Sequence, residues 1–178
     1  MNTPQPARFL SFAASLAVLL PGIALSQQAA PTSGAGDIAR GRYLVQIAGC
    51  NDCHTPGYAP TNGKVEERLW LTGDALGWRG PWGTTYPTNV RLYVQTITED
   101  AWLKRWRVGE ARPPMPWANL RAMTDADLRA IYRFAKHLGP AARAAPAYVP
   151  PDQQPKAPFV LYPSPPPEAQ HKPGAPHK

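Results

Sequence analysis

The feature that most constrains the fold of this 178-residue chain is the run Cys50-Asn51-Asp52-Cys53-His54. Two thiols three residues apart on a helical turn lie on the same side of that turn, and the adjacent imidazole is carried toward the same side. Cys-x-x-Cys-His is the attachment pattern of a c-type haem, in which the thiols bind the porphyrin and the histidine binds the iron. We therefore expect one covalent haem c held by Cys50 and Cys53, with His54 as an axial ligand.

Three other kinds of site also use paired cysteines. A thioredoxin-like redox pair is expected within a βαβ pattern, which is missing from this sequence. A zinc site needs about four ligands, and the remaining histidines, His137, His171 and His177, are scattered along the chain. A disulfide between Cys50 and Cys53 would close a very small, strained loop. Haem attachment is the interpretation that the motif favours.

The N-terminal end has the composition of a secretory signal peptide. Arg8 precedes an apolar run from Phe9 to Leu20, and the small residues Ala24 and Ser26 follow. A short basic region, an apolar stretch and a small-x-small end are the parts of such a signal. The alternative is an uncleaved membrane anchor, although a span needs roughly 20 apolar residues. We expect a signal peptide over residues 1–26, a flexible segment over 27–36, and export to the periplasm.

Proline dominates the C-terminal end, where 12 of the 40 residues from Gly139 to Lys178 are proline. Because proline fixes φ and lacks an amide hydrogen, we expect residues 141–178 to form an extended arm without helix or sheet ladders. Disorder is expected past Pro163. Some apolar side chains predict that the first part of the arm rests on the folded domain: Tyr148, Phe159, Val160, Leu161 and Tyr162.

Residues 37–140 remain as the folded domain, and a core of roughly 100 residues would be helped by a large buried cofactor. Three helices are expected there. The first runs over about 37–48; the second begins near Thr96, in a Thr-x-x-Glu capping box, and ends by Gly109. The third follows an N-cap at Thr124 and ends at Gly139. No strand pair is expected, so the predicted fold is mainly α with long loops.

The iron of such a haem could take a second protein ligand, and three side chains are candidates. Met115 lies in a stiff loop between Pro114 and Pro116, which lowers the entropy lost on ordering it. Met123 precedes the N-cap of the third helix and suits packing onto that helix. His137 lies in the last turn of the same helix, where the dipole favours a cation. We expect Met115 to be the ligand; an open site is a further alternative.

These residues resemble the class I cytochrome c family, in which the first helix ends in Cys-x-x-Cys-His, a loop supplies a methionine and the last helix packs on the first. Gly41 on the first helix, with Tyr132 and Phe134 on the last, suits that crossing. A narrower resemblance is to the cytochrome domains of bacterial membrane-bound alcohol and sugar-acid dehydrogenases. It is carried by Gly41-Arg42-Tyr43-Leu44, Cys50-Asn51-Asp52-Cys53-His54-Thr55-Pro56, Tyr86-Pro87-Thr88-Asn89-Val90 and Pro114-Met115-Pro116-Trp117.

The resemblance also implies contacts to the haem from the middle of the chain. In the family a backbone carbonyl near a Gly-Pro pair orients the ligating imidazole, and Pro81 is the candidate for that role here. Other side chains are expected to wall the haem or to bond its propionates: Trp78, Arg79, Trp82, Tyr86, Asn89 and Arg91.

Charge and motif together predict a role in electron transfer. The formal net charge of +7 suits an acidic protein partner or peripheral association with an anionic membrane, whereas scattered basic residues on an exported chain make nucleic acid a poor partner. We expect an electron carrier rather than an enzyme, between a dehydrogenase donor and an oxidase or reductase acceptor. One alternative is a cytochrome subunit fixed in an oxidoreductase complex. Another is a haem sensor or peroxidase with an open sixth site.

Overall fold

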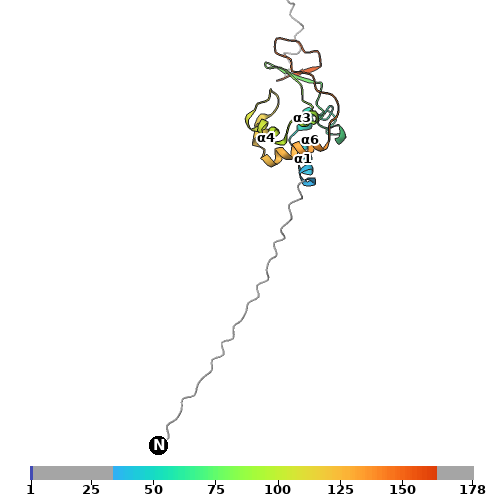
Figure 1. Ribbon diagram of the computed structural model, residues 1–178. Coiled ribbons are helices and arrows are strands. Elements are labelled where there is room, and N and C mark those ends of the chain that lie inside the picture. The colour runs from blue at the N-terminus through green and yellow to red at the C-terminus, as the bar shows by residue number, and fades with distance from the viewer. Residues whose placement is uncertain (2–33, 164–178) are drawn as a thin grey trace, which may run out of the picture. The chain divides into compact units, whose positions relative to one another are not determined.

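The computed structural model describes Met1 and residues 34–163, and the latter are mainly helical with a small sheet (Figure 1). Six α-helices, one 3-10 helix and three strands follow one another in this range. They are α1 (Ala35–Ile47), α2 (Cys50–His54), η1 (Glu67–Leu69), β1 (Gly77–Gly80), β2 (Gly83–Thr85), α3 (Val90–Thr96), α4 (Glu99–Val108), α5 (Trp117–Ala122), α6 (Asp125–His137) and β3 (Phe159–Leu161).

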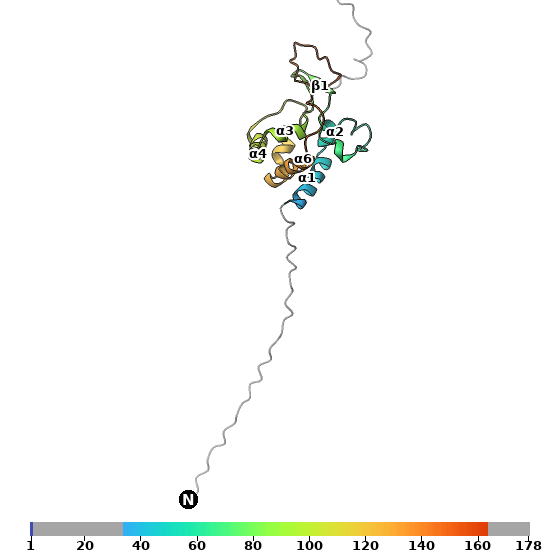
Figure 2. The same ribbon diagram turned by 45° about the vertical axis from the view of Figure 1, so that its right-hand side comes forward.

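Helices α1 and α6 cross in close contact, as both views show (Figures 1 and 2). Gly41 makes this possible, because a Cβ at that position would lie 2.1 Å from the carbonyl oxygen of Ala130 and 2.7 Å from Cβ of Phe134. Leu44 and Val45, on the same side of α1, are buried in the core. The helix crossing expected from Gly41 and Phe134 is therefore confirmed.

Aromatic residues of α4 and α6 fill the core next to this crossing. Trp102 is buried, and its indole N–H donates to the carbonyl oxygen of Leu128 at 2.8 Å. The hydroxyl of Tyr132 donates to the carbonyl oxygen of Ile97 at 2.9 Å. Each of these large side chains therefore contributes apolar burial while its single polar group is satisfied by backbone. Together the two hydrogen bonds tie α4 and its N-terminal approach to α6.

An ion-pair network on the surface joins the same three helices. Arg133 of α6 bonds Glu99 of α4 and also Asp37 of α1. Hydrogen bonds from Arg133, and then from Arg129, hold the pKa of the Glu99 carboxyl below its usual value. The pairs are partly exposed, so their contribution to stability is modest, and they mainly complement the packing of the apolar faces beneath.

The predicted helix starts were right at α6 and wrong at α4. Thr124 caps α6, since its hydroxyl accepts from the amide of Asp127 at 3.1 Å. For α4 the cap is Thr98, which accepts from the amide of Ala101, and not Thr96. The reason is that Thr96 ends a separate helix, α3, and Ile97 is extended, so the chain restarts as a helix two residues later than the capping-box pattern suggested.

The small sheet corrects two expectations, that there is no strand pair and that the arm forms no ladder. Its order is β2-β1-β3, with β1 antiparallel to β2 and parallel to β3. Strand β3 carries amide hydrogens because it lies between Pro158 and Pro163, so the prolines bound the strand instead of interrupting it. Amides on both sides bond across the ladder: Gly77 donates to the Pro158 carbonyl and Tyr162 to the Arg79 carbonyl, each at 2.8 Å.

Several predictions concern residues outside the described range. They are the signal peptide over 1–26, its cleavage after Ser26, most of the segment 27–36, and the disorder expected past Pro163; helix α1 already includes residues 35 and 36. Within residues 34–163, no helix is both long and apolar enough to cross a membrane.

Replacing Gly41 by alanine tests the helix crossing. The new methyl group would collide with the α6 backbone, which cannot give way without separating the helices, so Gly41→Ala should lower the free energy of unfolding by about 3 kcal/mol. Urea denaturation followed by circular dichroism measures this change. As a control, Gln46→Ala alters an exposed position of the same helix and should shift the value by no more than about 0.5 kcal/mol. Equal stability of the two variants would contradict the close packing.

Candidate functional site

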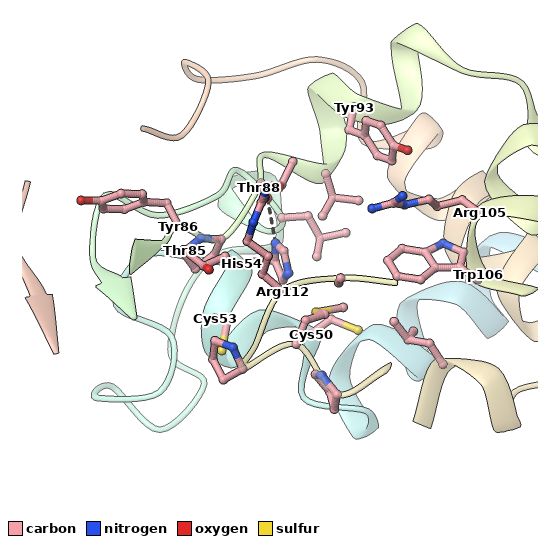
Figure 3. A pocket seen from close by; sticks show the side chains of 18 of the residues that line it. Cys50, Cys53, His54, Thr85, Tyr86, Thr88, Tyr93, Arg105, Trp106 and Arg112 are labelled. Atoms are coloured by element: carbon pink, nitrogen blue, oxygen red, sulfur yellow. Dashed lines mark hydrogen bonds between the residues drawn. The ribbon is translucent and has the colours of Figure 1, made fainter. Parts of the chain in front are cut away.

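A cavity of about 880 Å³ lies between α2, α4, the segment from β2 to α3, and the loop before α5 (Figure 3). This size is within the range of pockets that hold ligands as large as organic cofactors, roughly 300–1,000 Å³. Its walls are mostly apolar, with contributions from Val45, Leu71, Val90, Trp102, Leu120 and Ile131 among others. Six predicted site residues line it together: Cys50, Cys53, His54, Trp78, Tyr86 and Met115.

The two cysteines enter the cavity from one short helix. Gly49 has φ of 69°, a left-handed conformation that suits glycine, and this turn separates α1 from α2. Cys50 and Cys53 are one helical turn apart, both thiols are free, and both line the cavity (Figure 3). Burial raises the pKa of the Cys50 thiol to about 11 and also raises the pKa of Cys53. Both groups are therefore neutral thiols near pH 7, unlike the acidic thiolate of a thioredoxin-like pair.

His54 presents one nitrogen to the cavity because the other is bound. Its Nδ1 lies 2.7 Å from the carbonyl oxygen of Thr88, and since a carbonyl only accepts, Nδ1 carries the hydrogen. Nε2 is then left with a free lone pair. Burial lowers the pKa of the imidazole, against a smaller opposing effect of this hydrogen bond. The result is a neutral, oriented histidine, which is the form that binds metal ions.

Thr88, and not the predicted Pro81, supplies the carbonyl that orients His54. Pro81 is exposed in the turn between β1 and β2, where Gly80 pairs with Gly83, so the Gly-Pro pair serves the hairpin. The Thr88 segment is instead packed against the motif by Gly73. The Gly73 amide donates to the His54 carbonyl at 2.8 Å, and a Cβ on Gly73 would lie 2.7 Å from the Asn89 nitrogen.

The other residues predicted from the middle segment divide into two groups. Trp78 and Tyr86 line the cavity. Asn89 does not; its side chain caps α3 by accepting from the Leu92 amide at 3.0 Å and donates to the carbonyl oxygens of Ala141 and Arg143. It therefore positions the neighbouring Thr88 without facing the cavity.

Arg79, Trp82 and Arg91 also lie away from the cavity lining. Arg79 donates to backbone carbonyls of the C-terminal arm, at Pro151 and Gln153. The backbone carbonyl of Trp82 accepts a hydrogen bond from the hydroxyl of Tyr148 in the arm. Arg91 is buried and donates to the carbonyl of Gly139 at 2.5 Å, just past the end of α6. Arg79 and Arg91 therefore join segments of the chain, and the Trp82 ring packs against Tyr162 of the arm, in place of the cavity lining expected of these three residues.

Of the three candidates for a second axial ligand, Met115 alone lines the cavity. The Trp117 amide donates to the Met115 carbonyl at 2.8 Å, at the start of α5. Met123 lies at the C-terminal end of α5, where its carbonyl accepts from Arg107 at 2.7 Å. His137 is exposed in the last turn of α6.

The cavity also has polar residues that the sequence did not single out as site residues. Arg105 and Trp106 reach in from α4, opposite Cys50, Cys53 and His54 (Figure 3). Arg105 makes no ion pair within residues 34–163, and the Trp106 indole N–H is buried there without a partner. The sequence did carry a signal for these two residues. It was a basic residue directly before an aromatic residue in a predicted helix, in a chain expected to hold an acidic cofactor.

Two further polar groups complete this set. Arg112, at the start of the Met115 loop, lines the cavity and has no carboxylate partner in the described range. The hydroxyl of Thr85 is buried with no hydrogen-bond partner among the same residues. Unpartnered buried donors are uncommon in folded proteins, and in the lining of this cavity they are the Trp106 indole and the Thr85 hydroxyl. Arg105 and Arg112 are exposed, and Arg105 also donates to the Glu110 carbonyl at 3.2 Å. Within residues 34–163, no group of three or more His, Cys, Asp and Glu side chains gathers that could hold a metal ion.

The chain is similar to part of a known oxidoreductase. It is 26% identical over 158 aligned residues to a nicotinate dehydrogenase subunit of Pseudomonas putida, in a match that covers 76% of this chain. The same match covers 12% of the length of that protein. No family model matches the chain, and no solved structure matches it.

The reactivity of Cys50 tests the environment of the thiols. A pKa of about 11 leaves roughly a thousandth of the thiol ionised at pH 8, so in the chain with both cysteines reduced and unmodified its alkylation by iodoacetamide should be about a hundredfold slower than that of an exposed cysteine. Mass spectrometry of the labelled peptide measures the rate, which should rise about tenfold per pH unit up to pH 11. A rate at pH 8 equal to that of a free thiol would indicate an activated cysteine instead.

Proposed function

We propose that this protein carries one covalently bound haem c and passes single electrons between redox proteins. The observation that carries the proposal is one wall of a large cavity on which two free thiols and a neutral imidazole with a free Nε2 lie side by side. Cys50 and Cys53 would hold the porphyrin, and His54 would bind the iron.

The remaining cavity residues fit such a group. Met115 would be the second axial ligand, as a thioether among apolar walls. The buried Trp106 indole and Thr85 hydroxyl would offer donors without partners to two propionates, and Arg105 and Arg112 would offer positive charge. When bound, the haem would supply a one-electron Fe(III)/Fe(II) couple, with a potential raised by histidine–methionine ligation. The protein's own part is to exclude water from the cavity and to hold both ligands in place.

The helix arrangement supports a class I cytochrome c fold. Helix α1 runs into the motif helix α2 and crosses α6 at a glycine, and the methionine lies in the loop before α5, which precedes the last helix, α6. These are the relations on which the resemblance depends. The carboxyl-side extension with β3 is added to this plan, since β3 forms its sheet with the hairpin near the cavity.

An electron carrier is favoured over a sensor or a peroxidase. Those functions need an open or easily opened iron position. Of the candidate second ligands among the described residues, Met115 alone lines the cavity, and two prolines restrict its loop. We accordingly propose that the chain is not itself an enzyme, and that chemistry on an organic substrate belongs to a partner.

The comparison favours a dehydrogenase as that partner. Similarity to a nicotinate dehydrogenase subunit supports both a free carrier that accepts electrons from a dehydrogenase and a cytochrome subunit fixed in such a complex. The second is the more directly supported, because the relative is itself a subunit. We propose that the chain works in the periplasm, on the basis of the signal-like N-terminal sequence, and sequencing the N-terminus of the mature protein tests cleavage after Ser26.

Spectra of ligand variants test the haem and its ligands. The unmodified protein, expressed with haem-attachment machinery, should give a c-type pyridine haemochrome spectrum and a weak sulfur–iron band when oxidised. Met115→Ala should retain the haem, lose this band and lower the midpoint potential by on the order of 0.1 V, since axial ligands set potentials over a range of about 0.8 V. Met123→Ala, outside the cavity, is the matched control and should change neither. Retention of the band in Met115→Ala would sink the ligand assignment.

Association state separates the free carrier from the fixed subunit. Affinity purification of the tagged, full-length protein from its native cells, in buffer of moderate ionic strength, should recover a dehydrogenase at stoichiometric ratio if the chain is a subunit. A free carrier should elute as a monomer and should reoxidise a dehydrogenase only when added in solution. Raising the salt concentration separates the cases further, because a transient encounter steered by charge weakens steeply with ionic strength.

A further inference from the structure

The C-terminal arm, residues 141–163, contacts the wall of the cavity through Tyr148. The guanidinium of Arg112 lies over the Tyr148 ring, 3.8 Å from its centroid. On its other side the Tyr148 hydroxyl donates to the carbonyl oxygen of Trp82 at 2.7 Å. Arg112 begins the loop that carries Met115, and Trp82 lies in the turn between β1 and β2. Tyr148 thus connects the loop of one cavity wall to the hairpin of another.

The arm is seated on the hairpin by backbone contacts that leave Tyr148 little freedom. Thr84 and Val149 exchange two hydrogen bonds, of 2.7 and 3.0 Å. Gly83, with φ of 100°, lets the arm approach closely, because a Cβ there would lie 2.4 Å from the Val149 carbonyl and 3.0 Å from the Tyr148 ring. The tyrosine is therefore held from the hairpin side and presents its ring to the loop.

We propose that Tyr148 is a positioning residue for Met115, holding the loop that begins at Arg112 closed against the hairpin. This inference rests on the proposed haem function. The start of the Met115 loop is weakly held, because Met115 donates to the Arg112 carbonyl over a long 3.4 Å and Arg112 itself is exposed; the short bond of 2.8 Å, from the Trp117 amide to the Met115 carbonyl, lies at the other end of the loop. A guanidinium stacked by its face on an aromatic ring still has its edge free for carboxylates, so Arg112 can contact Tyr148 and an acidic ligand together.

Competition by imidazole measures how firmly the loop is held. Imidazole must displace Met115 from the iron of the oxidised protein, so its apparent affinity scales with the fraction of molecules whose loop is open. Tyr148→Ala should bind imidazole about tenfold more tightly than the unmodified protein, a change equivalent to about 1.4 kcal/mol. Tyr148→Phe keeps the ring under Arg112 and loses only the hydrogen bond, so its affinity should rise by less, about threefold.

A matched control removes a similar pair elsewhere. Arg40 lies over the exposed Tyr43 ring on α1 at 5.6 Å, and Tyr43→Ala should leave imidazole binding unchanged. In parallel, hydrogen–deuterium exchange of the peptide spanning residues 111–117 in the full-length protein should be faster in Tyr148→Ala than in Tyr43→Ala. This second readout does not depend on the haem.

The outcomes distinguish this inference from the proposed function. If Tyr148→Ala keeps the haem and the sulfur–iron band and its imidazole affinity is unchanged, the inference about Tyr148 is overturned. Faster exchange without a change in affinity overturns it too, because the arm would then be merely structural. Absence of covalent haem or of the sulfur–iron band in the unmodified protein contradicts the proposed function instead. In that case hydrogen–deuterium exchange over residues 111–117 alone tests the role of Tyr148 in holding the loop. Faster exchange in Tyr148→Ala than in Tyr43→Ala supports this role, and equal exchange rules it out.

Discussion

The contact on which most of this structure depends is the crossing of α1 and α6 at Gly41. Because no side chain separates the two helices there, the α1 backbone lies directly against the Ala130 carbonyl. The crossing fixes the direction of α1, and Gly49 then turns the chain into α2. The place of Cys50, Cys53 and His54 on the cavity wall follows from these two glycines. Helix α6 in turn supports Trp102 through the Leu128 carbonyl, so the opposite wall is built on the same helix.

A second constraint connects the motif to the middle of the chain. The Thr88 carbonyl selects the tautomer of His54 and leaves Nε2 for a ligand. Thr88 is held in turn by the Asn89 cap of α3 and by hydrogen bonds from Asn89 to the start of the C-terminal arm. Because the backbone sets its orientation, the imidazole keeps one geometry. An electron-transfer centre would need this, since it should rearrange little when its oxidation state changes. Three segments that are distant in sequence therefore orient the histidine: the motif itself, the Thr88–Asn89 segment and the start of the C-terminal arm.

The proline-rich arm is part of the folded domain, although its composition predicts an extended segment without ladders. Its prolines bound β3 and leave only short runs of residues that carry an amide hydrogen, and these runs pair with the hairpin on which Arg79, Trp78 and Trp82 lie. Aromatic rings of both segments pack together, with Tyr162 against Trp78 and Trp82. The arm therefore completes the end of the domain beside the cavity, where a helical core alone would leave the hairpin exposed.

Local patterns in the sequence determined much of this protein. The thiol spacing of the motif, the cap at Thr124, the helix end at Gly139 and the small residue at Gly41 act over a few neighbouring residues, so they were readable without the fold. Tertiary structure alone decided which carbonyl meets His54, that Arg79, Asn89 and Arg91 join segments instead of facing the cavity, and that the arm adds a strand. Each of these depends on contacts between residues tens of positions apart, such as Asn89 with Ala141, for which a single sequence carries no periodic signal.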